Sequence, residues 1–322
     1  MGLNLFEKNI SGPKVVVIGA GFVGSTFAYS LLIHGLVSQI VIIDINRERA
    51  EGEVMDLNHG LPFAHPVKIW SGDYSDCKDA DIVVIAVDKG QRIECSRLEL
   101  AEGNFEVLKQ VVPKIVEYNK KCILLVVTNP LDVMTYAVLK LSGFPENRVI
   151  GSGTILDTAR LRYLLGEHLK VDPRNVHAYI IGEHGDSEVP VWSLANVAGT
   201  RLKEYCPICK VPYDLEHFNG LFLKVRKAAY EIIKRKGRTH YAIALGLTKI
   251  VESIRLDQNA ILTVSCLLHD YYGVSDICLS VPAIVNRSGI RETIKLPLDE
   301  KEVKDFQKSA AIIKEVADSL GL

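Results

Sequence analysis

A glycine-rich turn between an apolar segment and a helical segment constrains this fold most. Gly19, Gly21 and Gly24 follow the apolar residues 14–18 and open a helical stretch at residues 22–34. Glycines at this spacing allow a tight turn, a close approach of the backbone to a phosphate group, and tight packing of the helix on the strand. The amino end of the helix then faces the phosphates. The pattern indicates a dinucleotide-binding unit.

Short apolar runs alternate with helical stretches in the first half of the 322-residue chain. The runs cover residues 14–18, 39–44, 81–87, 122–128 and 148–150, and the helical stretches cover 22–34, 47–58, 98–118 and 131–142. Runs that are apolar throughout are typical of parallel strands with helices on both faces. We predict an α/β fold, with a Rossmann-type doubly wound parallel sheet over residues 1–150.

The pattern changes after residue 150. We expect helices at 154–170, 215–236, 239–254 and 300–320, and strands at 260–269 and 277–285. Because these helices and strands are clustered instead of alternating, residues 151–322 are predicted to form a second, α+β domain.

Asp44 indicates which dinucleotide binds. It ends the second apolar run, twenty residues after Gly24, where an acidic side chain can bind the adenosine ribose hydroxyls. A carboxylate there would repel the extra phosphate of NADP, so we expect NAD.

Composition favours small-molecule chemistry. With 38 Lys and Arg against 39 Asp and Glu, the net charge is -1, so neither nucleic acid nor an anionic membrane is an expected partner. Seven scattered cysteines, and the absence of a signal-like or membrane-spanning apolar run, favour the cytoplasm. Cys206 and Cys209 have ligand spacing, but His217 alone lies nearby. We expect no metal, with a metal or redox module as a weak alternative.

A histidine between glycines and carboxylates is the candidate for proton transfer. His184 lies in Gly182-Glu183-His184-Gly185-Asp186, and imidazole can give or take a proton near neutral pH. Asp157 and Arg160 are three residues apart on an expected helix, so they share one face. A buried Asp157 would raise the pKa of His184, and an arginine fork can hold a substrate carboxylate.

Five segments together resemble one enzyme family. They are Gly19-Ala20-Gly21-Phe22-Val23-Gly24, Val127-Thr128-Asn129-Pro130, Gly151-Ser152-Gly153-Thr154, Leu156-Asp157-Thr158-Ala159-Arg160 and Gly182-Glu183-His184-Gly185-Asp186. Their order and spacing resemble the L-lactate/malate dehydrogenase family, most closely the bacterial L-lactate dehydrogenases regulated by fructose 1,6-bisphosphate. The resemblance implies NADH-dependent reduction of pyruvate to L-lactate by a cytoplasmic homotetramer.

The resemblance also implies roles for individual residues. His184 is the acid/base, Asp157 its partner, Arg160 the carboxylate clamp, and Arg97 the cation on a mobile loop that polarises the ketone. The resemblance implies that Gln91, Asn129 and Thr239 also contact the substrate. The cofactor-binding residues implied are Gly19, Gly21, Phe22, Val23, Gly24, Asp44, Val127 and Asn129.

The substrate-specificity position is Gln91. A neutral side chain there is typical of lactate enzymes, whereas malate enzymes carry an arginine, because a second carboxylate needs a cation. A register shift of one residue would place Arg92 there instead. Malate dehydrogenase is therefore the alternative.

The same region departs from the family. Ala86-Val87-Asp88 replaces the usual Thr-Ala-Gly, and Arg92-Ile93-Glu94-Cys95-Ser96 lacks the usual Pro and Gly. Asp88 would bring negative charge near the cofactor pyrophosphate unless Lys89 or Arg92 offsets it. A catalytically weakened NAD-binding homologue is a further alternative.

Arg162 lies two residues after Arg160 and must point elsewhere on the helix. The resemblance implies that Arg162 and His177 bind the effector fructose 1,6-bisphosphate across a subunit interface.

Overall fold

A computed structural model describes residues 12–89 and 97–322, with Arg97 as backbone only. Within these residues the centre is a nine-stranded sheet in the order β14-β13-β12-β6-β5-β4-β1-β2-β3. Six of its strands are parallel and come from the first half of the chain: β1 (Lys14–Ile18), β2 (Gln39–Ile43), β3 (Lys68–Ser71), β4 (Ile82–Ile85), β5 (Ile123–Val126) and β6 (Val149–Gly151).

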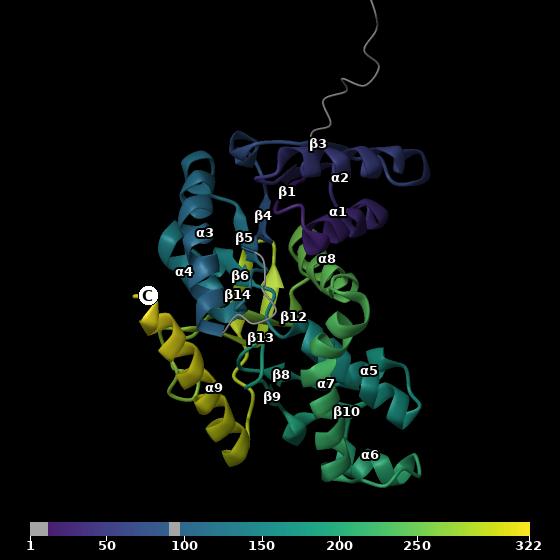
Figure 1. Ribbon diagram of the computed structural model, residues 1–322. Helices are drawn as coiled ribbons and strands as arrows, with labels where there is room; N and C mark the ends of the chain where they lie inside the picture. The colour runs from purple at the N-terminus through teal and green to yellow at the C-terminus, as the bar shows by residue number, and fades with distance from the viewer. Residues whose placement is uncertain (1–11, 90–96) are drawn as a thin grey trace, which may run out of the picture.

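Helices cover both faces of the parallel strands. They are α1 (Phe22–His34), α2 (Arg47–His59), α3 (Arg97–Tyr118) and α4 (Leu131–Ser142). Figure 1 shows α3 and α4 on one side of the sheet and α1 on the other. The predicted doubly wound Rossmann-type sheet is thereby confirmed.

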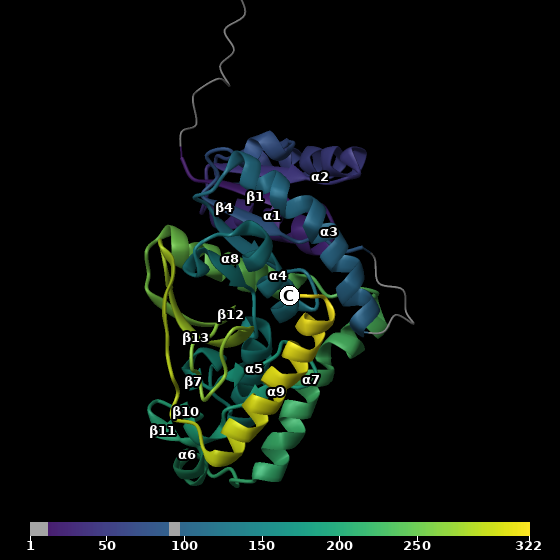
Figure 2. The ribbon, with the colours of Figure 1, turned by 90° about the vertical axis from the view of Figure 1, so that its left-hand side faces the viewer.

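The second half of the chain extends the same sheet. Its longer strands are β12 (Ala260–Leu267), β13 (Cys278–Asn286) and β14 (Gly289–Thr293), and its helices are α5 (Ile155–Leu169), α6 (Leu202–Ile208), α7 (Leu215–Lys236), α8 (Tyr241–Arg255) and α9 (Glu300–Ser319). These three strands are antiparallel, and β12 joins β6 where Ser265 pairs with Gly151. In Figure 2 these helices pack around the strands below the parallel half.

Two small sheets lie beside α5. One joins β7 (Val176–His177), β10 (Asn196–Val197) and β11 (Thr200–Arg201), and the other joins β8 (Ile180–Ile181) and β9 (Val189–Pro190). Ile180 is fully buried, and its carbonyl accepts a hydrogen bond from Thr154 Oγ1 at 2.5 Å. This contact fixes the start of α5 against β8.

Two apolar cores hold the elements together. In the larger core the middle strands are buried on both faces, as the fully buried Val16, Val84 and Leu125 show. The smaller core joins α5 and α7 through Leu165 and Phe218. Each such side chain contributes roughly 1.5–3 kcal/mol by leaving water.

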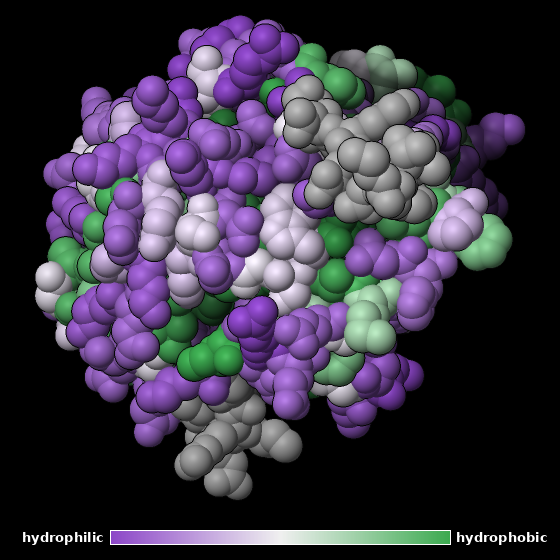
Figure 3. Space-filling view, turned by 90° about the horizontal axis from the view of Figure 1, so that it is seen from above, coloured by the Kyte–Doolittle hydropathy of each residue, from purple (hydrophilic) through white to green (hydrophobic). Residues whose placement is uncertain are grey.

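The outer surface is mainly hydrophilic. Seen from the top of Figure 1, polar side chains cover most of the face and apolar areas are scattered between them (Figure 3). In the described part of the chain, the helices are too short or too polar to cross a membrane.

Candidate active site

The glycine turn after β1 is packed against the end of β4. Gly19 has φ +109°, and a Cβ there would lie 2.4 Å from the carbonyl oxygen of Ala86. A Cβ on Gly24 would lie 1.9 Å from the carbonyl oxygen of Gly19. By contrast, a Cβ on Gly21 would meet no atom within 4 Å. Gly19 and Gly24 therefore allow tight packing, while Gly21 leaves open space at the amino end of α1.

The open space suits the phosphates of a dinucleotide. No described side chain caps the amino end of α1, so its first backbone N–H groups are available to an anion. Asp44 lies beside the turn, because its Oδ2 accepts a hydrogen bond from the Ala20 backbone N–H at 2.6 Å. Its Oδ1 accepts one from the Asn46 N–H at 2.8 Å. A carboxylate has further lone pairs for ribose hydroxyls, so these residues fit NAD.

The segment after β5 lies at the same edge of the sheet. The Val127 N–H donates to the carbonyl of Ile85 at 2.9 Å. Asn104, which is 1% exposed, donates from Nδ2 to the Asn129 carbonyl at 2.7 Å and accepts from the Lys89 N–H at 2.8 Å. Asn104 thus ties the end of β4 to the segment with Asn129. The sequence shows only a polar residue within a helix, and so did not reveal this contact.

His184, Asp157 and Arg160 lie together at this site. Asp157 Oδ2 lies 2.5 Å from His184 Nδ1, and Asp157 Oδ1 accepts a hydrogen bond from Arg160 Nη1 at 2.9 Å. The Asp157 side chain is 4% exposed, while those of Arg160 and His184 keep 15% and 28%. The carboxylate is therefore buried behind a cation and an imidazole that reach toward solvent.

The electrostatics of this pair favour protonated His184. Burial alone would lower the pKa of His184, but the charge and hydrogen bond of Asp157 outweigh it and raise the pKa to about 9. Burial alone would raise the pKa of Asp157, but His184 and Arg160 outweigh it and lower the pKa. The arrangement can hold a proton on His184 and direct it outward from the ring nitrogen that faces away from Asp157.

A second buried carboxylate holds the loop that carries His184. Asp132 on α4 is 1% exposed, and its Oδ2 accepts the His184 backbone N–H at 2.7 Å. Its Oδ1 accepts from the hydroxyls of Ser265 at 2.6 Å and Ser280 at 3.3 Å. Burial raises the pKa of Asp132 to about 6, against these hydrogen bonds. Asp132 is an acidic residue in the first turn of an apolar helix. This pattern could have indicated a buried role, but sequence analysis did not single it out.

Glu188 is a third buried acid near the pair. It is 6% exposed, and within the described structure its Oε1 has no hydrogen-bond partner. Burial, followed by the negative charge of Asp157, raises the pKa of Glu188 to about 9. The side chain is therefore neutral at pH 7, and sequence analysis did not single it out.

Thr239 lies in the connection between α7 and α8. The following residue, His240, contacts the first turns of α1: its Nδ1 is 2.9 Å from Thr26 Oγ1, and its ring centroid is 5.5 Å from that of Phe22. Thr239 is thus placed beside the amino end of α1, close to the exposed Phe22. Val23 is half-buried in the same turn.

Arg162 points away from Arg160, as the helical angle predicts. Its Nε donates to the Ala178 carbonyl at 3.1 Å, and its guanidinium lies 5.4 Å from the centroid of the Tyr179 ring. His177, the residue before Ala178, is exposed. Arg162 is therefore half-buried against the residues that directly follow the exposed His177.

Two of the predicted residues cannot be placed with the others. Gln91 lies outside the described residues, as does the segment from Arg92 to Ser96. Arg97 is the first residue of α3, and its side chain is not described.

The two cysteines with ligand spacing lie on α6 and just after it. Cys206 is buried in the smaller core, and Cys209 Sγ donates to the carbonyl of Cys206 at 3.3 Å. Across the described ranges, no group of three or more His, Cys, Asp or Glu side chains is arranged to hold a metal ion.

Comparison with known proteins finds one enzyme family along nearly the whole chain. Residues 13–151 match the NAD binding domain of lactate/malate dehydrogenases, and residues 154–320 match their alpha/beta C-terminal domain. The match to the first of these confirms NAD as the cofactor.

Individual relatives are similar over nearly their full length. The L-lactate dehydrogenase of Acetivibrio thermocellus is 55% identical, covering 96% of this chain and 98% of that protein. L-lactate dehydrogenase 1 of Clostridium acetobutylicum is 49% identical, covering 95% and 98%.

Solved structures of lactate dehydrogenases have the same fold as this chain. A lactate dehydrogenase from a Medee basin deep-sea metagenome library has a TM-score of 0.92 and 43% identity, covering 96% of this chain and 99% of that one. The minor L-lactate dehydrogenase of Enterococcus mundtii, in a ligand-bound form, has a TM-score of 0.92 and 40% identity, covering 95% and 98%. The chain therefore belongs to the lactate/malate dehydrogenase family of NAD-dependent oxidoreductases.

Proposed function

We propose that this enzyme reduces pyruvate to L-lactate with NADH. The observation that carries the proposal is the 2.5 Å contact between Asp157 and His184, with Arg160 on the same carboxylate. NADH, when bound at the turn before α1, supplies the hydride. His184 donates its proton to the ketone oxygen as negative charge develops there.

Arg160 binds the substrate in this proposal. A guanidinium has five N–H donors, and in the described structure Arg160 uses its Nη1 for the contact with Asp157. Further donors are therefore available for the substrate carboxylate. Two parallel hydrogen bonds to that carboxylate fix its orientation. Asn129 and Thr239 are proposed to complete the pocket, and Arg97 to polarise the ketone.

The relatives favour pyruvate over oxaloacetate. Those named above at 49% and 55% identity are both called L-lactate dehydrogenases. A neutral Gln91 at the specificity position agrees with them, because oxaloacetate would bring a second carboxylate that needs a cation.

The test is NADH oxidation with pyruvate and with oxaloacetate, each with and without fructose 1,6-bisphosphate. We expect a higher kcat/KM with pyruvate, and loss of activity in His184→Gln. Preference for oxaloacetate would identify a malate enzyme. NADH binding without turnover of either substrate would identify a weakened homologue.

We propose that Arg162 and His177 bind the effector fructose 1,6-bisphosphate. Support comes from their proximity through Ala178 and from the exposure of His177. An effector activates when it binds the active arrangement more tightly. Arg162→Gln is expected to abolish activation while retaining turnover at saturating pyruvate. Equal activation in this variant would place the effector elsewhere.

We further propose that the enzyme is a cytoplasmic homotetramer. Large apolar side chains are exposed on α1 and α8, including Tyr29 at 54%, Ile33 at 50% and Leu245 at 56%. Such exposure marks a surface suited to contact with another subunit.

A further inference from the structure

A second pocket lies at the opposite edge of the parallel strands from the candidate active site. Its lining includes the residues that precede β4 and β5 and the last residues of α8, and the cavity measures about 460 Å³. Small-molecule sites in proteins are typically about 300–1,000 Å³. The proposed function uses none of its lining residues.

The lining is strongly cationic. The basic residues are Lys78, Lys120, Lys121, Arg148, Arg255 and Arg287. Asp79 and Asp81 are the acidic residues, and Asp81 Oδ2 already accepts a hydrogen bond from the Lys14 backbone N–H at 2.8 Å. Six positive charges therefore face two negative ones in a chain whose net charge is -1.

The cations of the pocket are not neutralised internally. Among the described residues, the ion pairs lie elsewhere and include none of these six side chains. Excess charge of one sign within a concave site raises the local concentration of the opposite ion. The pocket thus attracts anions by its own field.

Two half-buried arginines, Arg148 and Arg255, line this site. Arg148 Nη1 donates a hydrogen bond to the carbonyl of Lys121, which orients the guanidinium before any ligand arrives. Arg255 Nε is shielded from solvent and has no acceptor within the described structure. Because Nε is shielded, Arg255 acts on this site through its positive charge and not through that atom.

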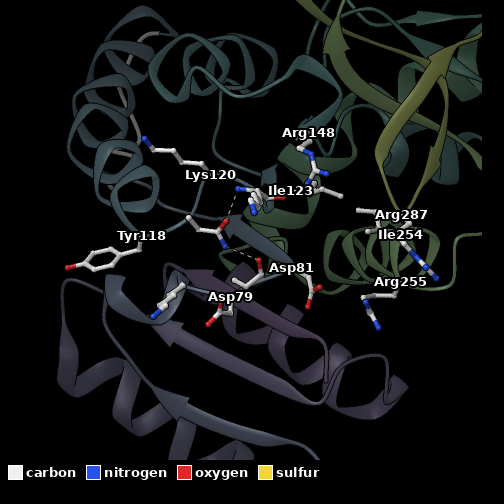
Figure 4. Close-up of a pocket in the computed structure, with 13 residues that line it drawn as sticks. Asp79, Asp81, Tyr118, Lys120, Ile123, Arg148, Ile254, Arg255 and Arg287 are labelled. Carbon is white, nitrogen blue, oxygen red and sulfur yellow. Dashed lines mark hydrogen bonds between the residues drawn. The ribbon is translucent and has the colours of Figure 1, made fainter. Parts of the chain in front are cut away.

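The arginines come from parts of the chain that are distant in sequence. Arg148 precedes β6, Arg255 ends α8, and Arg287 lies in the turn between β13 and β14. Figure 4 shows Arg255 and Arg287 on the same flank of the pocket, with Arg148 above them. Cations from separate elements can contact separate groups of one ligand, as a compound with several phosphates requires.

We propose that this pocket binds a small molecule carrying two or more phosphate groups. Guanidinium groups bind phosphate oxygens through paired hydrogen bonds. Ile123 and Ile254 line the same cavity but are almost fully buried, so the pocket presents mainly charged and polar groups to a ligand. A concave pocket of about 460 Å³ on a chain without excess positive charge favours a small anion over nucleic acid.

The test is isothermal titration calorimetry with sodium tripolyphosphate at low ionic strength, where charge interactions are least screened. Saturating NADH occupies the dinucleotide site, and an Arg162→Gln/His177→Gln background removes the proposed effector site. In this background we expect one binding event per chain. Arg255→Gln/Arg287→Gln is expected to weaken binding about tenfold or more, because each lost charged hydrogen bond is costly.

A control variant that loses two positive charges elsewhere on the surface distinguishes binding in this pocket from nonspecific attraction by the positive charge of the protein. Lys234→Gln/Lys314→Gln removes two exposed cations on α7 and α9 and is expected to change affinity less than about twofold. Equal weakening by both double variants, or no binding in the background, would overturn the proposal. If the pocket variant does not fold, the exposed Arg287→Gln alone is expected to weaken binding by about threefold or more.

Discussion

At the scale of single residues, Asp157 is expected to set the pH range of the reaction. Pyruvate reduction needs protonated His184, whose pKa is raised to about 9 by Asp157, so kcat/KM is expected to fall as pH rises through that value. In Asp157→Asn the raising charge is gone, and the fall should begin about one to three pH units lower. At neutral pH, kcat/KM should also decrease about a hundredfold. The measurement is kcat/KM for pyruvate against pH.

The control for this prediction is His184→Gln. It has no imidazole to titrate, so its residual activity is expected to lack this alkaline decrease. An alkaline decrease at the same pH in wild type and Asp157→Asn would show that another group controls the profile.

Glu188 is expected to make stability depend on pH. Its folded pKa, about 9, lies above its ordinary value of 4.5. Between these values the folded chain holds a proton that the unfolded chain releases, so its contribution to the unfolding free energy is full below about pH 4.5 and is lost as pH rises through about 9. Glu188→Gln removes this titration. Its urea midpoint should therefore improve relative to wild type from about pH 5 to about pH 9.

A constant difference between the two urea midpoints over that range would show that Glu188 has its ordinary pKa in the folded state. Wild type provides the reference at each pH, so the effects of other carboxylates cancel.

The sequence predicts the central site residues but not those that support them. Asp157 and Arg160 lie three residues apart on an expected helix, a spacing that implies proximity, and the family resemblance adds His184 as the partner of Asp157. Asp132 is 52 residues from His184, and its role depends on how α4 packs against the loop. Such a contact follows from tertiary structure, and residue type and local spacing do not reveal it.

At the scale of elements, the long helices and the buried strands were predictable, whereas the short helix α6 and the edge strands were not. Helices α1, α4 and α7 have the bounds that the sequence predicts. Strand β3 was missed, because an edge strand with one side toward solvent need not be apolar, and β3 begins with the exposed Lys68. Strand β14 was missed for the same reason: three of its five residues are exposed.

Asp132 joins helix α4 to strands β12 and β13 and to the loop that carries His184. Its removal should lower the stability of the folded chain. Asp132→Ala leaves the His184 N–H and the hydroxyls of Ser265 and Ser280 without their acceptor. We expect the unfolding free energy to fall by about 3 kcal/mol or more, since unpaired buried donors are costly. Asp132→Asn keeps one acceptor oxygen and should lose less. Urea unfolding of both variants measures the difference, and equal losses would contradict the role of the hydrogen bonds.

The segment after β4 is expected to weaken cofactor binding. Asp88 follows Ala86, whose carbonyl packs on the glycine turn, so its charge lies near the proposed pyrophosphate position. Asp88→Gly should bind NADH about three- to tenfold more tightly, as like charges repel. Fluorescence titration measures this affinity. Asp88→Asn separates charge from size, and unchanged affinity in both variants would mean that neighbouring cations already offset Asp88.

At the scale of the whole molecule, the sheet separates two regions of different charge chemistry. The carboxyl ends of the parallel strands carry the glycine turn and the segment with Asn129, whereas the amino ends carry the basic pocket with Arg148. Helix α8 connects them: its amino end lies beside α1 through His240, and its last residue is Arg255. Both regions therefore lie beside the same helix.

Assembly depends on surface that the single chain leaves apolar. Ile33 on α1 and Leu245 on α8 are about half exposed, and α1 packs along α8 (Figure 1). If subunits meet there, Ile33→Glu/Leu245→Glu would bury charges at the interface, so sedimentation velocity should show a smaller species than wild type. Lys234→Gln/Lys314→Gln, which alters exposed polar positions, should sediment as wild type does. A double glutamate variant that keeps the wild-type sedimentation coefficient would place the subunit contacts on another face.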